Sequence, residues 1–224
     1  MCVVRVKVHM AEQQGEQAAS SLCDQLQITA EELQTRLAFL SFAEQDGRNL
    51  VEIHDVISSH IDEIIREFYD HLLQFEELRG ILSDQALVER LKGTQRQYLL
   101  SLGLSADCVE YAEGRLRIGL THERVGLKQK WYLGAYHKLY ELILQRLAVR
   151  YSGDASRLSS LVLTLNKIIT LDEVFVVETY YHTTMQRLED SLFRLKSAHR
   201  QLEDLSRRDF LTPVDNRRAL MEAL

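Results

Sequence analysis

One histidine lies in a setting that would suit a metal ligand. His122 comes near the end of an expected helix, and the next residues, Glu123 to Leu127, include a glycine that predicts a turn. A new helix then opens on aromatic residues, Trp131 and Tyr132. A histidine in this position can reach out of its helix and donate an imidazole nitrogen to a metal. Taken alone, such a histidine is more typical of a surface or capping residue, so the interpretation depends on a pocket facing it.

Other chemistry finds little support in the sequence. The eight histidines form no His-Glu-x-x-His pair, and the three cysteines form no Cys-x-x-Cys, which argues against a zinc site made by protein ligands alone. Phosphate-binding glycine motifs and the Gly-x-Ser-x-Gly nucleophile motif are also missing. Adjacent carboxylates fall on expected solvent faces of helices: Asp62/Glu63, Glu76/Glu77 and Glu189/Asp190. We therefore predict no catalytic residues.

The composition indicates a helical protein of the cytosol. Of the 224 residues, 46% are hydrophobic, while only one is proline and ten are glycine, which favours long helices. A net charge of −6 without a lysine and arginine cluster argues against nucleic-acid binding. No apolar run of about 18 residues predicts a membrane span, and no secretory signal is visible. The widely spaced cysteines indicate free thiols, so we predict a cytoplasmic location.

Apolar periodicity outlines the helices that must position His122. The first helix is expected from Thr29 to about Phe42, with Glu32 completing a capping-box pattern. Further helices are expected at about 47–58, from residue 61 to about 73, over 87–98, from 107 to about 122 and over 128–151, with a short helix and loop at 74–84. The helix from residue 61 carries Phe68 and Tyr69 near its middle. The fold class is therefore all-α.

The two ends of the chain differ from this central part. In residues 1–28, four valines indicate a short strand as one alternative (Val3, Val4, Val6 and Val8), while residues 12–21 show no periodic apolar stripe. We favour a poorly ordered leader, with Met1 and Met10 both possible starts. From Ala155 a helical pattern continues to Arg208, which would be about 80 Å long and too long for one compact domain. Its second half fits a heptad, with apolar residues at Leu188, Leu192, Leu195 and Leu202. This pattern predicts a dimeric coiled coil or, alternatively, an amphipathic surface helix.

Three blocks of sequence, in order, resemble globin-coupled sensors. Thr121 to Tyr136 is similar to the family's proximal signature, His-x-Arg-Ile-Gly-Leu followed by Trp-Tyr-x-Gly-Ala. Ile61 to Leu72 resembles its distal Phe-Tyr helix, and Val88 to Thr94 resembles its other distal helix. The resemblance covers about residues 30–185. It implies a globin fold with an extra N-terminal helix and a dimer formed through the last two long helices.

The resemblance also assigns roles to residues. It implies that haem b is the cofactor, with His122 as the proximal iron ligand and Tyr69 as the distal hydrogen-bond donor to dioxygen. Carbon monoxide and nitric oxide are the alternative gases. The remaining implied haem-pocket residues are Phe68 against the porphyrin, Leu91 and Thr94 on the distal side, and Tyr132 near the proximal imidazole.

The C-terminal residues resemble a second family. Arg208 to Leu220 is similar to the start of a GGDEF-type diguanylate cyclase domain, Asp-x-Leu-Thr-Gly-Leu-x-Asn-Arg-Arg, but Pro213 and Val214 replace the Gly-Leu. The remainder of such a domain is missing from the sequence, so no cyclase activity is expected of this chain. A polar helix end with a proline stop is the alternative reading.

These features predict four segments and one function. The segments are a leader at 1–28, a sensor globin domain at 29–185, a helical linker or coiled coil at 186–208, and a truncated GGDEF-like start at 209–224. The predicted function is a haem-based dioxygen sensor that signals through a homodimer to a diguanylate cyclase output. The alternatives are a haem-free helical dimerisation module and a gas-binding or detoxifying globin without signalling.

Overall fold

The described part of the protein is a bundle of helices with one helix that leaves it. The structure is a computed structural model, and it describes residues 21–207. Within this range the secondary structure is helical, without a strand. The helices are α1 Leu22–Gln25, α2 Ala30–Phe39, α3 Glu44–Leu72, α4 Glu76–Ile81, α5 Gln85–Leu100, α6 Val109–Arg124, α7 Gln129–Arg150 and α8 Ala155–Arg207.

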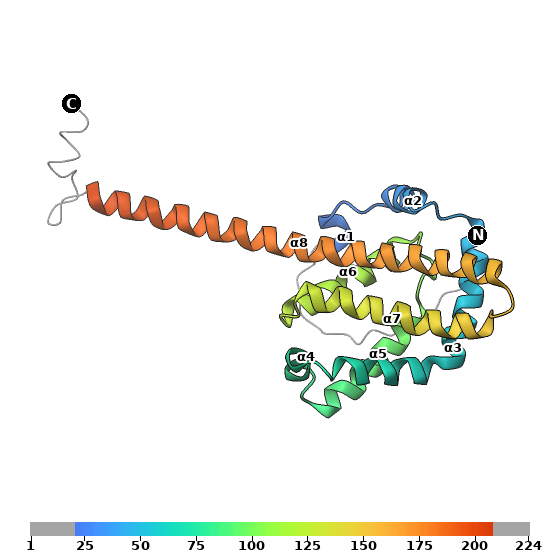
Figure 1. The fold of residues 1–224 in the computed structure, drawn as a ribbon. Helices are drawn as coiled ribbons and strands as arrows, with labels where there is room; N and C mark the ends of the chain where they lie inside the picture. Colours follow the sequence, from blue (N-terminus) through green and yellow to red (C-terminus); the bar gives the residue numbers. More distant parts are fainter. Residues whose placement is uncertain (1–20, 208–224) are drawn as a thin grey trace.

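The helices are layered around α7 and α8. These two helices run side by side in opposite directions after a tight connection, with α3 and α5 on one side of the pair and α6 against α8 (Figure 1). The helix α8 continues well beyond the others (Figure 1). Within the described residues no helix combines the length and the apolar character that a membrane span requires.

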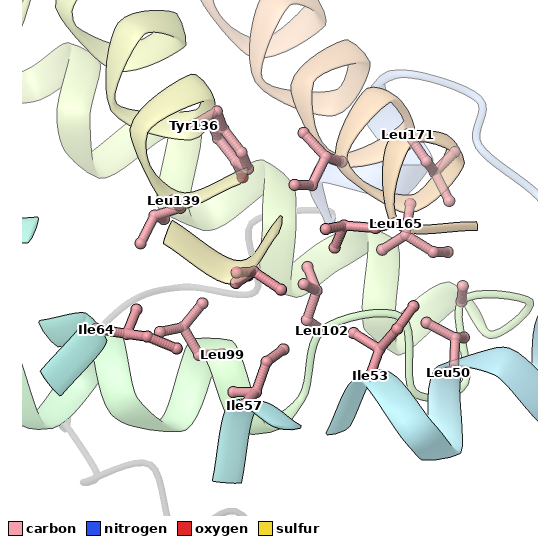
Figure 2. Packing of buried hydrophobic residues seen from close by; sticks show 14 of the residues in the cluster. Leu50, Ile53, Ile57, Ile64, Leu99, Leu102, Tyr136, Leu139, Leu165 and Leu171 are labelled. Carbon is pink, nitrogen blue, oxygen red and sulfur yellow. The ribbon is translucent and has the colours of Figure 1, made fainter. Parts of the chain in front are cut away.

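The core lies where α3, α5, α7 and α8 meet. Ile57 and Ile64 of α3 lie beside Leu99 at the end of α5, Ile53 points into the core further along α3, and Leu165 of α8 lies on the opposite side of the core (Figure 2). These side chains are fully buried. On α3 they recur at intervals of four and seven residues, which places them on one face of a helix. Burial of this face therefore fixes how α3 packs against the rest.

A polar cluster fixes the start of α8 against the start of α3. The Thr164 hydroxyl donates to Asp46 Oδ1 at 2.6 Å, and Asn49 Nδ2 donates to Thr164 Oγ1 at 2.8 Å. Lys167 Nζ lies 2.9 Å from Asp46 Oδ2. All of the buried polar atoms in this cluster find partners, as a buried network requires. The cluster holds the N-terminal part of α8 in place at the end remote from the coiled-coil segment.

Most expected helices are confirmed, with two differences at their ends. Thr29 caps α2 by accepting from Glu32 N, but the Glu32 carboxylate binds Arg36 and does not close a capping box. The helices expected at 47–58 and from 61 are one element, α3, which bends at His60 (φ −124°, ψ 15°). The bend falls within the segment where the sequence indicated a break.

The expectation of a poorly ordered leader up to residue 28 is wrong for its last eight residues. Residues 22–25 form α1, capped by Ser21, whose hydroxyl accepts from Asp24 N. Cys23 and Ile28 are buried in the core, and α1 packs on α6. A single helical turn with two buried side chains leaves no periodic stripe, so the sequence carried no signal for it. Residues 1–20 and the predicted GGDEF-like segment at 209–224 lie outside the described residues.

Candidate functional site

The turn after His122 has a geometry that depends on Gly126. Gly126 takes a left-handed conformation (φ +75°), which favours glycine. Its N–H donates to Glu123 O at 2.9 Å, and Leu127 N–H donates to His122 O at 3.0 Å. These two bonds make a Schellman motif, which ends α6 and satisfies carbonyls of its last turn. The backbone of His122 is therefore tied directly to the turn that begins the path to α7.

His122 is prepared to act as a neutral ligand. Its Nδ1 lies 2.8 Å from Ile118 O, so Nδ1–H donates to this carbonyl and Nε2 keeps its lone pair. Burial lowers the pKa of His122 below its ordinary value, an effect that the hydrogen bond to Ile118 only partly offsets. The ring packs edge-on against Tyr132, with centroids 4.7 Å apart. The imidazole is therefore oriented, neutral at pH 7 and able to offer Nε2 to a metal.

Tyr69 presents a buried phenol from α3. Its side chain is 5% exposed, and its ring packs edge-on against Phe68 at 5.5 Å. Burial raises the pKa of Tyr69 to about 12, so its hydroxyl is protonated at neutral pH and can donate. Lys92 Nζ of α5 lies over the ring, 6.0 Å from its centroid. The structure thus places Tyr69 at the contact between α3 and α5.

The other predicted site residues fall into two groups. Phe68, Tyr69 and Tyr132 belong to one hydrophobic core cluster, and Leu91 packs against it from α5. Thr94 is different, because it is exposed and its hydroxyl donates to Arg90 O of its own helix at 3.3 Å. Phe68, Tyr69, Tyr132 and Leu91 therefore belong to the main hydrophobic core, and Tyr132 contacts His122. Thr94 lies at the surface.

Two further contacts beside His122 were not foreseen from the sequence. The Tyr180 hydroxyl of α8 donates to Leu127 O at 2.8 Å, and its ring lies 6.4 Å from that of Tyr132. Glu123, the residue after His122, pairs with Arg187 of α8. Neither partner on α8 carries a sequence signal, because each is an ordinary polar residue on a long helix. Both become visible only when α6 packs against α8.

A buried charge on α8 is the third feature that sequence reasoning missed. Asp172 is fully buried and binds Arg115 of α6. One signal could have indicated it, since an aspartate one residue after Leu171 and three before Phe175 interrupts a strongly apolar stretch.

Within the described residues, no group of three or more His, Cys, Asp and Glu side chains could hold a metal ion.

Comparison with known proteins agrees with this geometry. The family model described as Protoglobin matches residues 29–186. The chain belongs to the protoglobin family. The match begins at the cap of α2 and ends on α8 shortly before the first leucine of the predicted coiled coil, so it includes α2 to α7 and the packed part of α8.

Two relatives of this protoglobin extend the comparison. The heme-based aerotactic transducer HemAT of Halobacterium salinarum is 32% identical over 181 residues, which is 77% of this chain and 37% of the transducer. The chain thus spans little more than a third of that relative. The globin domain of a Geobacter sulfurreducens globin-coupled sensor superposes with a TM-score of 0.60 at 21% identity, covering 66% of this chain and 96% of that domain. The fold is therefore a globin of the sensor type, as the sequence resemblance implied.

The residues at the site fit a haem group. His122 offers one neutral nitrogen, and the described residues place no second protein ligand cluster beside it. A single histidine suits an iron whose other ligands are the nitrogens of a porphyrin. Phe68, Leu91 and Tyr132 would offer apolar surface to such a ring, and Tyr69 would offer one donor.

Proposed function

We propose that this protoglobin is a haem-based gas sensor whose ligand is dioxygen. One observation carries the proposal: His122 holds Nδ1–H on Ile118 O and leaves Nε2 free to ligate a metal, within a chain that matches the protoglobin family over residues 29–186. The relative named as a heme-based aerotactic transducer supports haem b as the cofactor and gas sensing as the task.

Each of the proposed site residues would have a separate role in binding haem. Haem supplies an iron that binds a diatomic gas. His122 would hold the iron, and the ring of Tyr132, in edge-on contact at 4.7 Å, would keep the His122 imidazole from rotating. Phe68 and Leu91 would keep water away from the bound group. Thr94 stays a predicted second hydroxyl on the distal helix, less than one turn from Leu91, and its exposed position gives that role no support.

Tyr69 is the reason for preferring dioxygen among the gases. Dioxygen held at a ferrous iron carries partial negative charge, and carbon monoxide carries much less, so a hydrogen-bond donor favours dioxygen. Because the pKa of Tyr69 is raised, its hydroxyl is protonated at neutral pH and can donate a hydrogen bond. Carbon monoxide and nitric oxide remain ligands that the same pocket could take.

A stripe of exposed apolar residues on α8 supports a homodimer. The stripe comprises Val174, Val177, Tyr181, Leu188, Leu192, Leu195 and Leu202, which are 39–66% exposed. Their spacings of three, four and seven residues follow one heptad seam along the helix. The segment from Leu188 to Leu202 has no partner helix within the described chain, and a helix of this kind is marginal alone in water. We therefore propose that a second copy of α8 covers this stripe.

Signal transfer would then run from His122 to the α8 dimer. The helix α6, which carries His122, packs directly on α8, so a shift of the histidine reaches α8 without an intermediate domain. The relay requires two arrangements of these helices that bind the gas with different affinity. We propose a cytoplasmic protein whose output is of the diguanylate cyclase type, on the resemblance of residues 208–220.

The visible absorption spectrum of the purified protein tests the haem proposal. We expect a Soret band that is lost in His122→Ala and returns with added imidazole, and that persists in His137→Ala, which alters an exposed histidine of α7. Colourless protein after expression with haem supply would instead favour a haem-free helical dimerisation module.

The mass in solution and its dependence on gas test the signalling role. We expect a dimer that dissociates when Leu192→Glu places a charge in the stripe, while Glu189→Ala on the same exposed segment leaves it intact. A gas-binding monomer that shows no change in α8 on adding dioxygen would point to a storage or detoxifying globin.

A further inference from the structure

Three side chains from two helices, α5 and α6, meet around one buried carboxylate on α8. Asp172 is fully buried, and its Oδ1 accepts from the Tyr111 hydroxyl at 2.6 Å. Its Oδ2 accepts from the Tyr98 hydroxyl at 2.8 Å and lies 3.0 Å from Arg115 Nε. The Arg115 contact is an ion pair without hydrogen-bond geometry, since Nε has no hydrogen-bond partner. Asp172 thus holds α5 through Tyr98 and α6 through Tyr111 and Arg115.

Arg115, the cation of this cluster, is enclosed by aromatic side chains. The Arg115 guanidinium lies between two tyrosine rings, 4.2 Å from the centroid of Tyr98 and 4.4 Å from that of Tyr111. Removing both charges from water costs much of what their attraction gains, and well-packed apolar residues often serve stability as well. Stability alone therefore gives a weak account of this arrangement. The contacts of the cluster instead link the relative positions of the helices that meet in it.

The two helices joined to Asp172 each carry one of the proposed haem contacts, Leu91 on α5 and His122 on α6. On α5, Tyr98 follows Leu91 by seven residues, and on α6, His122 follows Arg115 by seven residues. Seven residues are two helical turns, about 10 Å, and return a side chain to the same face. On each of these two helices, the proposed haem contact and the link to Asp172 therefore lie on one face.

A second route joins the cluster to His122 through α7. The rings of Tyr98 and Tyr136 lie 6.1 Å apart, and the Tyr132 hydroxyl donates to the Tyr136 hydroxyl at 3.3 Å. Tyr132 is the residue whose ring contacts His122. The cluster thus reaches the histidine along α6 itself and across two tyrosines of α7.

Asp172 is also close to the proposed dimer stripe. Val174 and Val177 follow it by two and five residues on α8 and face outward, 40% and 39% exposed, while Asp172 faces inward. A displacement of the helix at Asp172 therefore moves the stripe with it.

We propose that Asp172 is a positioning residue that sets α5 and α6 relative to each other, and so fixes His122 relative to Leu91 while coupling both helices to α8. The proposal rests on the proposed haem function for its ligand-binding readout. Asp172→Asn keeps the shape of the side chain and removes its charge. Tyr98→Phe and Tyr111→Phe each remove one hydroxyl and keep the ring. Asp190→Asn, on the exposed part of α8, is the matched control.

The experiment measures three quantities on the full chain. These are the dissociation rates of dioxygen and carbon monoxide, the iron–histidine stretching frequency of the haem-loaded protein, and amide hydrogen exchange across residues 118–127 of the haem-free protein. We expect Asp172→Asn to change the dioxygen dissociation rate about 3- to 30-fold, a range typical of residues that couple sites without touching the ligand. We also expect a shifted iron–histidine band and faster exchange confined to residues 118–127, with Asp190→Asn matching the unaltered protein. Tyr98→Phe and Tyr111→Phe should move the same readouts in the same direction.

A purely structural role predicts a different result. Asp172→Asn would then lower the denaturant midpoint and raise exchange throughout the chain, while gas dissociation rates stayed within about 2-fold and the iron–histidine band stayed in place. That result would overturn the proposal. If Asp172→Asn fails to fold, Tyr98→Phe and Tyr111→Phe decide the question by the same readouts. If the unaltered protein binds no haem, the proposed function fails, and exchange across residues 118–127 still decides whether Asp172 positions His122.

Discussion

Replacing Gly119 tests how closely α6 must approach α8 for His122 to reach its position. Gly119 lies on α6, three residues before His122, and is buried against α8. A Cβ at this position would lie 3.1 Å from Thr179 Cβ and Oγ1 and 3.3 Å from Val176 Cα. One of these atoms is backbone of α8, so a side-chain rotation cannot relieve the contact. Alanine at residue 119 must push the two helices apart.

Gly114 provides the matched control on the same helix. It is exposed, and a Cβ there would meet nothing within 4 Å. Glycine to alanine inside a helix gains about 1 kcal/mol of stability from helix propensity, so Gly114→Ala should gain that amount. Gly119→Ala gains the same term and loses about 1–3 kcal/mol to overpacking. We expect Gly119→Ala to be about 0–2 kcal/mol less stable than the unaltered protein.

Urea unfolding followed by far-UV circular dichroism measures both variants, with an unchanged dependence on urea as the check for two-state behaviour. In a Thr179→Ala background, which removes Oγ1, the cost of Gly119→Ala should shrink. The reasoning is refuted if Gly119→Ala and Gly114→Ala stabilise the protein equally, because α6 and α8 would then not be in close contact at this point.

Three further predictions concern Tyr69, Tyr180 and His54. Tyr69→Phe removes the proposed donor and should speed dioxygen release or autoxidation about 10-fold, for a lost hydrogen bond of about 1.4 kcal/mol; stopped-flow kinetics that match the unaltered protein would remove this role. Tyr180→Phe leaves Leu127 O without its donor and should cost about 1 kcal/mol of unfolding free energy in urea, with a changed emission of Trp131, the one tryptophan; equal stability and emission would contradict the link. Burial lowers the pKa of His54, so the unfolded chain binds more protons there, and stability should fall as pH drops below about 6.5 toward the folded pKa. The difference between the urea midpoints at about pH 7.5 and 5.5 should be smaller in His54→Gln than in the unaltered protein and unchanged in His137→Gln, and His122, whose pKa burial also lowers, contributes to the difference that remains. Identical pH dependence in all three proteins would refute this.

The helices could be predicted from the sequence because their information is local. Apolar residues at intervals of three and four outlined α2, α3, α5, α6 and α7, and the heptad leucines outlined the exit of α8. The turn that ends α6 was also predictable from local information, because glycine at position 126 tolerates the positive φ that this turn requires. The resemblance of separated sequence blocks supplied the globin fold, which the matches to the protoglobin family and to a sensor globin domain confirmed.

The candidate site was predictable only in part. His122 and Tyr69 were named from motifs, but the hydrogen bond from Nδ1 to Ile118, which makes Nε2 the available nitrogen, is a product of helix geometry and burial. Thr94 shows the opposite outcome. The position of Thr94 on α5 followed from the sequence, whereas its exposure depends on the rotation of α5 about its own axis relative to α3.

By itself, the sequence determined which segments are helical, where His122 lies relative to its turn, and which family the chain belongs to. These are properties of neighbouring residues and of motifs, so they can be predicted without knowing any long-range contact. The tertiary structure alone decided that Asp172 of α8 meets Tyr98, Tyr111 and Arg115, residues 57–74 positions earlier in the chain. Such a contact depends on helix packing, because an isolated charge gains a partner and loses its water only when the helices come together. The position of His122 beside its turn is thus determined by the local sequence. Its connection to α8 is determined by the packing of the helices.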